Sequence, residues 1–172
     1  IHARLARALL RLELRVEPGA MLLPVGYSLG CTILSDYFYD RQKPRPALGP
    51  DGGEIPLTTF AAGATLAGMV TLGNNMPVFF QTVRFDDPID LPGPDLTGRV
   101  PPVWLNIYDP DDPLGWPLGP LHPSYAALVT DVPVEVGPPV LTATAASHAH
   151  YWTDPDVHEP VARLIADLLD RA

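Results

Sequence analysis

Apolar and polar positions recur with helical spacing in three parts of the chain. In residues 1–16 apolar side chains return every three or four positions while arginines occupy the other faces, which predicts an amphipathic helix. Residues 156–172 show the same spacing behind Pro155 and predict a second amphipathic helix. Residues 29–39 carry a third helical pattern. The chain is therefore expected to contain at least three helices.

Short apolar runs between these segments predict strands. The runs are residues 20–25, 66–72, 103–108 and 132–136. The first three are apolar on successive positions, as in strands buried on both faces, whereas Pro133 in the fourth run indicates an edge strand. The Pro/Gly-rich segment near 41–63 predicts a surface excursion. Strands that alternate with helices or long connections predict an α/β fold, a mostly parallel sheet flanked by helices.

Charge and cysteine content exclude some kinds of partner. The net charge is −9 at pH 7, with 11 Lys and Arg against 20 Asp and Glu, so the chain is expected to repel nucleic acid and anionic lipid surfaces. The single cysteine, Cys31, excludes an internal disulfide and a Cys-rich metal site and is expected to be a small buried core residue. Pro24 and the glycines after it interrupt the most hydrophobic stretch, so no membrane span is expected in this portion.

One pentapeptide points to nucleophilic catalysis. Gly26-Tyr27-Ser28-Leu29-Gly30 lies directly between a predicted strand and a predicted helix. In a nucleophile elbow the serine sits on a strained strand-to-helix turn, and glycines two positions before and after it are expected to leave room for that turn. The turn would expose the Ser28 hydroxyl and aim the backbone N–H of Leu29 at an oxyanion.

These residues resemble the α/β-hydrolase superfamily, in particular its serine esterase and lipase-like members. Residues 25–30 are similar to the family's elbow, with Tyr27 where such enzymes often have His, and residues 69–75 resemble its next strand end. Residues 104–112 resemble the acid-bearing strand and loop, and residues 147–152 resemble the loop of the catalytic histidine. The resemblance implies an α/β-hydrolase fold and a Ser-His-Asp triad that needs no cofactor, acting on a small-molecule or lipid ester.

The resemblance also indicates which acid and which base complete the triad. Asp112 is the preferred acid, because Asp112-Pro113-Leu114 looks like the family's Asp-Pro-apolar continuation, while Asp109 and Asp111 remain alternatives. His148 is the preferred base, because it begins a His-x-x-Tyr-Trp pattern. His150 is only two residues away, and an extended loop would place the two imidazoles on opposite sides.

The histidines and acids between His148 and Glu159 could alternatively suggest a zinc site, since imidazole and carboxylate are ordinary zinc ligands. Their spacing lacks a His-Glu-x-x-His motif, and acids near Pro155 are explained by the start of a helix. No metal or other cofactor is therefore expected.

One helix alone precedes the elbow, whereas in the family several strands do. We therefore expect residues 1–172 to be the C-terminal portion of a single α/β-hydrolase domain lacking its N-terminal strands, with a preceding segment or a second chain completing the sheet. An α/β-hydrolase scaffold without catalysis, serving as a binding or interaction module, is the alternative function.

Overall fold

The computed structural model describes residues 1–42, 52–54, 56–79, 87–138 and 146–171. The helices are α1 (His2–Glu13), α2 (Leu29–Gln42), α3 (Met76–Phe79), α4 (Pro123–Leu128) and α5 (Pro155–Leu169). The strands are β1 (Val25–Tyr27), β2 (Met69–Leu72), β3 (Trp104–Tyr108) and β4 (Val129–Pro133). Short 3₁₀ turns occur at Pro94–Leu96, Gly119–Leu121 and Ser147–His150. No helix within the described ranges is long and apolar enough to cross a bilayer.

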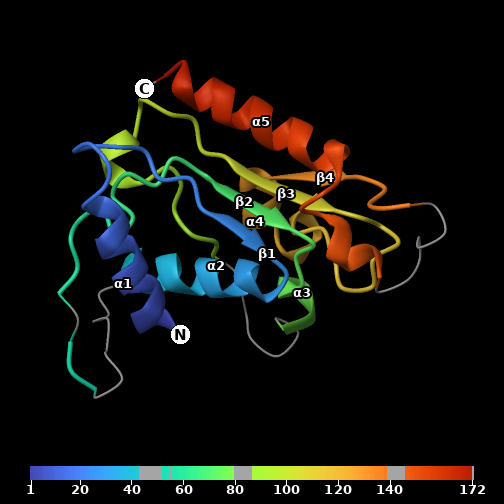
Figure 1. Ribbon diagram of the computed structural model, residues 1–172, viewed down its shortest axis with the longest axis horizontal. Helices are drawn as coiled ribbons and strands as arrows, with labels where there is room; N and C mark the ends of the chain where they lie inside the picture. The colour runs from blue at the N-terminus through green and yellow to red at the C-terminus, as the bar shows by residue number, and fades with distance from the viewer. Residues whose placement is uncertain (43–51, 55, 80–86, 139–145, 172) are drawn as a thin grey trace.

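The four strands form one parallel sheet in the order β1-β2-β3-β4 (Figure 1). Every neighbouring pair is parallel, and Tyr27, at the end of β1, pairs with Leu72, at the end of β2. The predicted α/β class with a parallel sheet is thus confirmed. Parallel strands end at the same edge of a sheet, so the segments that follow β1, β2 and β3 emerge side by side.

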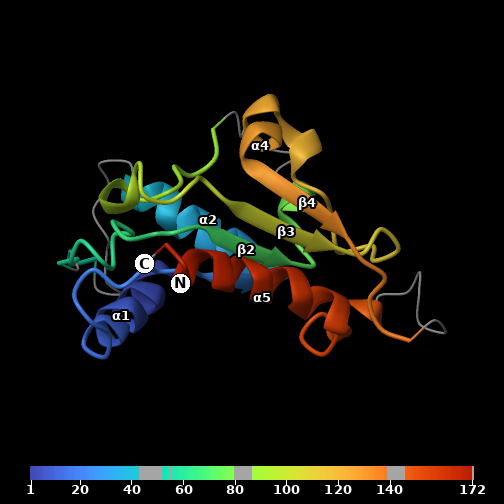
Figure 2. The same cartoon turned by 90° about the horizontal axis from the view of Figure 1, so that it is seen from above.

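Helices cover both faces of the sheet, and the strands are apolar on both sides for that reason. Met69 and Trp104 point to the face covered by α1, α2 and α4, while the next residue of each strand points to the face covered by α5. Figure 2 shows α5 in front of the sheet and α2 behind it. These continuous apolar runs are typical of a parallel sheet between two helical layers.

Two of the four predicted strands are displaced from their predicted positions. The run 20–25 contributes only an isolated bridge between Leu22 and Leu66, and the regular strand is Val25–Tyr27, because Pro24 has no N–H to pair with β2. The fourth strand is Val129–Pro133, three residues before the predicted 132–136. Pro133 is the last residue of this strand, which lies at the far edge of the sheet as predicted.

The prediction that the whole segment near 41–63 lies on the surface is wrong for its last residues. Phe60 is 7% exposed and Ala61 is fully buried. The hydroxyl of Tyr37 in α2 donates a hydrogen bond to the carbonyl of Ala61, and Gly63 packs closely against the ring of Phe38. The end of this segment is therefore part of the core beneath α2. Residues 43–51 and 55 lie outside the described residues.

Strand β1 stands at one edge of the sheet. Within the described residues it has a strand neighbour on one side alone, and Val25 on this edge is 37% exposed. An unpaired side was predicted for the run 20–25, and β1 has one. The prediction that this strand is buried holds only in part.

Candidate active site

Ser28 occupies a strained turn between β1 and α2. Its φ is +53°, and it is the one non-glycine residue with positive φ in the described part of the chain. A left-handed conformation at a non-glycine residue costs about 1–3 kcal/mol and persists where neighbouring contacts enforce it. Here the Ser28 N–H donates to the Leu72 carbonyl at 3.0 Å, and the Ser28 carbonyl accepts from the Cys31 N–H at 3.0 Å. The backbone of Ser28 is therefore held at the end of the sheet by contacts on both sides.

The two glycines of the motif have different roles. A Cβ on Gly26 would lie 2.9 Å from the Cα of Cys31 and 3.1 Å from a methyl group of Leu34, so the first turn of α2 can approach β1 only over a glycine. At Gly30 a Cβ would meet nothing within 4 Å. The expectation that the turn needs glycine on both sides is thus wrong for Gly30, because that position lies in α2 and faces open space.

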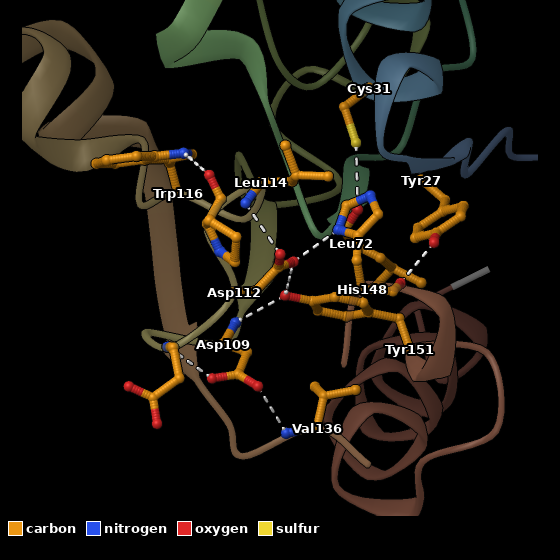
Figure 3. Close-up of polar contacts among 12 residues, drawn as sticks. Tyr27, Cys31, Leu72, Asp109, Asp112, Leu114, Trp116, Val136, His148 and Tyr151 are labelled. Carbon is orange, nitrogen blue, oxygen red and sulfur yellow. Dashed lines mark hydrogen bonds and ion pairs between the residues drawn. The ribbon is translucent and has the colours of Figure 1, made fainter. Parts of the chain in front are cut away.

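Asp112 and His148 are in direct contact, although they are 36 residues apart in the chain. His148 Nδ1 lies 2.6 Å from Asp112 Oδ2 (Figure 3), and both residues are buried, with relative exposures of 9% and 2%. A carboxylate can only accept, so the imidazole carries its proton on Nδ1 and keeps its lone pair on Nε2. That Nε2 is buried and has no hydrogen-bond partner, so the Ser28 hydroxyl is not bonded to it here.

Gly73 places the His148 ring beside the end of β1. A Cβ on Gly73 would lie 3.0 Å from His148 Cε1, the carbon between the two ring nitrogens. The pairing of Tyr27 with Leu72 and the bond from Ser28 N–H to the Leu72 carbonyl put Ser28 next to Gly73 across the two strands. The imidazole of His148 therefore lies over the strand end that neighbours Ser28.

The other candidate acids have structural positions. Asp109 is 1% exposed, and its carboxylate accepts hydrogen bonds from the backbone N–H groups of Asp111 and Val136. It thereby ties the start of the acid loop, residues 109–118, to the segment after β4. Asp111 is exposed. Asp112 Oδ1 accepts from the Leu114 N–H at 2.9 Å, which fixes the carboxylate with Oδ2 toward His148.

The other candidate histidines lie away from Asp112. The ring of His150 packs against Gly137, where a Cβ would lie 3.1 Å from its Cγ. His158, on α5, is hydrogen-bonded through Nε2 to the carbonyl of Trp152. The predicted separation of His148 from His150 is present, but its predicted cause is wrong: both lie in a 3₁₀ turn and not in an extended loop.

Two polar side chains, buried Asn106 and half-buried Asp131, brace the far end of the acid loop. Asn106 in β3 donates to the Trp116 carbonyl and to Asp131 in β4. The Asp131 carboxylate in turn accepts from the backbone N–H groups of Leu118 and Gly119. The loop is therefore fixed to two strands at its far end, whereas Asp109 fixes its near end.

Two tyrosines, to which the sequence patterns assigned no role in the site, enclose the pair. Tyr27 stacks on the His148 ring, with centroids 5.1 Å apart and planes at 29°, and its hydroxyl donates to the His148 carbonyl. The Tyr151 hydroxyl donates to Asp112 Oδ2 at 3.1 Å and accepts from the Asp109 N–H at 2.8 Å. Burial raises the pKa of Tyr27 and of Tyr151, so both hydroxyls stay protonated near neutral pH.

The arrangement joins a strained serine, a carboxylate-bound imidazole and a helix N-terminus at the C-terminal ends of the strands. Leu29 is the first residue of α2, so its N–H has no carbonyl one turn earlier to bond and lies at the positive end of the helix dipole. In the described part of the chain no three His, Cys, Asp or Glu side chains converge as metal ligands do. No protein-family model, curated protein or solved structure matches this chain.

Proposed function

We propose that this protein is a serine hydrolase that cleaves carboxylic esters through an acyl-enzyme intermediate. One observation carries the proposal. His148 is bound to Asp112 through Nδ1 and has an unpartnered Nε2, and its ring lies over Gly73, the neighbour of the left-handed Ser28. A proton acceptor of this kind beside a strained serine is what activation of a hydroxyl requires.

The proposed reaction begins when the Ser28 hydroxyl attacks the ester carbonyl and His148 Nε2 takes its proton. Asp112 holds the imidazole in the required tautomer and stabilises the imidazolium that forms. The Leu29 N–H donates to the oxyanion of the tetrahedral intermediate. His148 then gives its proton to the departing alkoxide, which leaves as the alcohol. Water, activated by the same imidazole, releases the acid and restores Ser28.

Apolar side chains around the site support an ester with apolar substituents. Leu29 follows the serine directly and is 49% exposed, while Leu114 and Trp116 of the acid loop are 41% and 44% exposed. Trp152, 52% exposed, lies edge-on to Tyr27. These groups come from three separate segments near the same strand ends. A small-molecule or lipid ester would remove their apolar surface from water.

Hydrolysis of a short activated ester by two histidine variants tests this function. His148→Ala removes the proposed base and should lower kcat by about a thousandfold or more, leaving residual catalysis from binding and the oxyanion site. His150→Ala is the matched control, because its ring packs on Gly137, and it should cost about tenfold or less.

Circular dichroism of both variants excludes unfolding as the cause of a loss. Full activity of His148→Ala would contradict the proposed mechanism. A folded wild-type protein without ester hydrolysis would instead favour the scaffold without catalysis.

A further inference from the structure

Tyr151 is hydrogen-bonded to the candidate acid Asp112 from outside the pair. Its side chain is fully buried, and its hydroxyl uses its one proton and one lone pair on two partners of the acid loop, Asp112 and Asp109 (Figure 3). The hydroxyl donates to the same oxygen, Asp112 Oδ2, that faces His148 Nδ1. Asp112 Oδ2 therefore stands between an imidazole and a phenol.

Two glycines make room for this phenol. A Cβ on Gly73 would lie 2.8 Å from Tyr151 Cε2, and a Cβ on Gly115 would lie 2.7 Å from the Tyr151 hydroxyl and 2.8 Å from Asp112 Oδ2. Any larger residue at either position would push the ring or the hydroxyl away from the carboxylate. The contact is thus built by three separate segments: the end of β2, the acid loop and the histidine loop.

We infer that Tyr151 is a positioning residue for the proposed hydrolase, which holds Asp112 in register with His148 and shares the negative charge of its carboxylate. The inference rests on the proposed function. It extends that function from three residues to four, because a carboxylate with one donor on Oδ1 and two on Oδ2 has no freedom to rotate away from the imidazole. Tyr151 itself acts through Asp112 and touches no reacting atom.

The hydrogen bond from Tyr151 to Asp112 predicts the direction in which the pH profile should move when the hydroxyl is removed. When the phenol donates to Oδ2, less negative charge is left to stabilise the imidazolium of His148. Loss of the hydroxyl should therefore make His148 harder to deprotonate and move the acid limb of the pH profile to higher pH. Among the described residues, the titratable groups near the pair include Tyr27 of β1, Cys31 of α2 and Asp109. Burial raises the pKa of Tyr27 and of Cys31, so both stay neutral in that range.

Tyr151→Phe removes the hydroxyl alone and tests the inference. We expect kcat for an activated ester to fall by about tenfold or more, as for a lost hydrogen bond to a charged group, with KM almost unchanged. The acid limb of kcat/KM should move to higher pH. Tyr37→Phe is the matched control, since this residue of α2 also loses a buried hydroxyl bonded to an oxygen, the carbonyl of Ala61, and it should leave the pH profile in place.

Proton NMR of His148 separates this inference from the proposed function. The Nδ1 proton in a 2.6 Å hydrogen bond should give a far-downfield signal, which should move in Tyr151→Phe and stay in Tyr37→Phe whether or not the protein hydrolyses esters. If Tyr151→Phe does not fold, Gly115→Ala places a methyl group against the same hydroxyl and should move the same signal. A pH profile and a proton signal that match those of Tyr37→Phe would overturn the inference. A wild-type protein without activity would overturn the proposed function instead.

Discussion

The ring of Tyr27 stacks on the imidazole of His148 with the two planes at 29°, and its hydroxyl donates to the carbonyl of the same histidine. Tyr27 of β1 thus contacts both the side chain and the backbone carbonyl of His148. In the α/β-hydrolases that the motif resembles this position is often His, which is smaller than Tyr. Tyr27 therefore links the residue before the candidate nucleophile to the candidate base.

Tyr27→Phe should keep the stacking and lose the bond to the His148 carbonyl. Leaving a buried carbonyl without its donor lowers the stability of the local structure by about 1 kcal/mol. We therefore expect kcat to fall about fivefold and the thermal midpoint of unfolding to drop by a few degrees. Tyr27→Ala also loses the stacked ring and should be slower than Tyr27→Phe. Steady-state kinetics and calorimetry of both variants check this. Equal rates for Tyr27→Ala and the wild type would show that the stacking does not position His148.

The two glycines of the elbow motif should respond oppositely to alanine. Gly26→Ala places a methyl group against the backbone of Cys31 and should destabilise the protein by about 1–3 kcal/mol, with loss of activity as α2 moves away from β1. Gly30→Ala meets open space inside α2 and should be active, with stability unchanged or raised by up to about 1 kcal/mol. Denaturant unfolding and ester hydrolysis compare them. Inactivity of a stable Gly30→Ala protein would contradict this account of the turn.

Asp112 and Asp109 are both buried, and their amide variants should separate catalysis from stability. Asp112→Asn keeps the shape but disturbs the tautomer of His148, so kcat should fall by about 10³- to 10⁴-fold. Asp109→Asn loses an acceptor for Val136 N–H or Asp111 N–H and should cost about 1–3 kcal/mol of stability with a smaller effect on kcat. The reverse order of the two kcat values would move the acid assignment to Asp109.

Alkaline pH should weaken the fold through buried groups in α2. Burial raises the pKa of the Cys31 thiol from 9.0 to about 12 and that of Tyr37 from 10.0 to about 12. Both protons are held more tightly in the folded protein, so this stability is fully present below pH 9 and is lost as pH rises toward 12. Urea unfolding between pH 8 and pH 11 measures the slope, and Cys31→Ala should flatten it. A slope that Cys31→Ala leaves unchanged would contradict the role of the thiol.

Local sequence patterns predicted the elements in which a regular spacing extends over several residues. The helical spacing of α1, α2 and α5 was readable, and so was the apolar run of β3. Strand β1 is only three residues long and follows Pro24, so its boundaries depend on pairing with β2 and could not be read locally.

The candidate site was predictable in its residues but not in its contacts. The elbow motif points to Ser28, and its first glycine, Gly26, has a local cause in the close approach of α2. The bond between Asp112 and His148 joins residues from separate loops, and only the parallel order of the strands brings them together. The role of Tyr151 depends on space left by Gly73 and Gly115, two glycines that carry no distinguishing signal in the sequence.

Ser28 is the activated nucleophile of the proposed reaction, and covalent labelling of its hydroxyl is a direct test. A fluorophosphonate forms a bond only with a serine whose hydroxyl has been activated, and mass spectrometry of the digested protein identifies the residue that carries it. We expect a single adduct on Ser28, no adduct in Ser28→Ala and strongly slowed labelling in His148→Ala. A folded wild-type protein that forms no adduct, or forms it on a residue other than Ser28, would show that Ser28 is not an activated nucleophile.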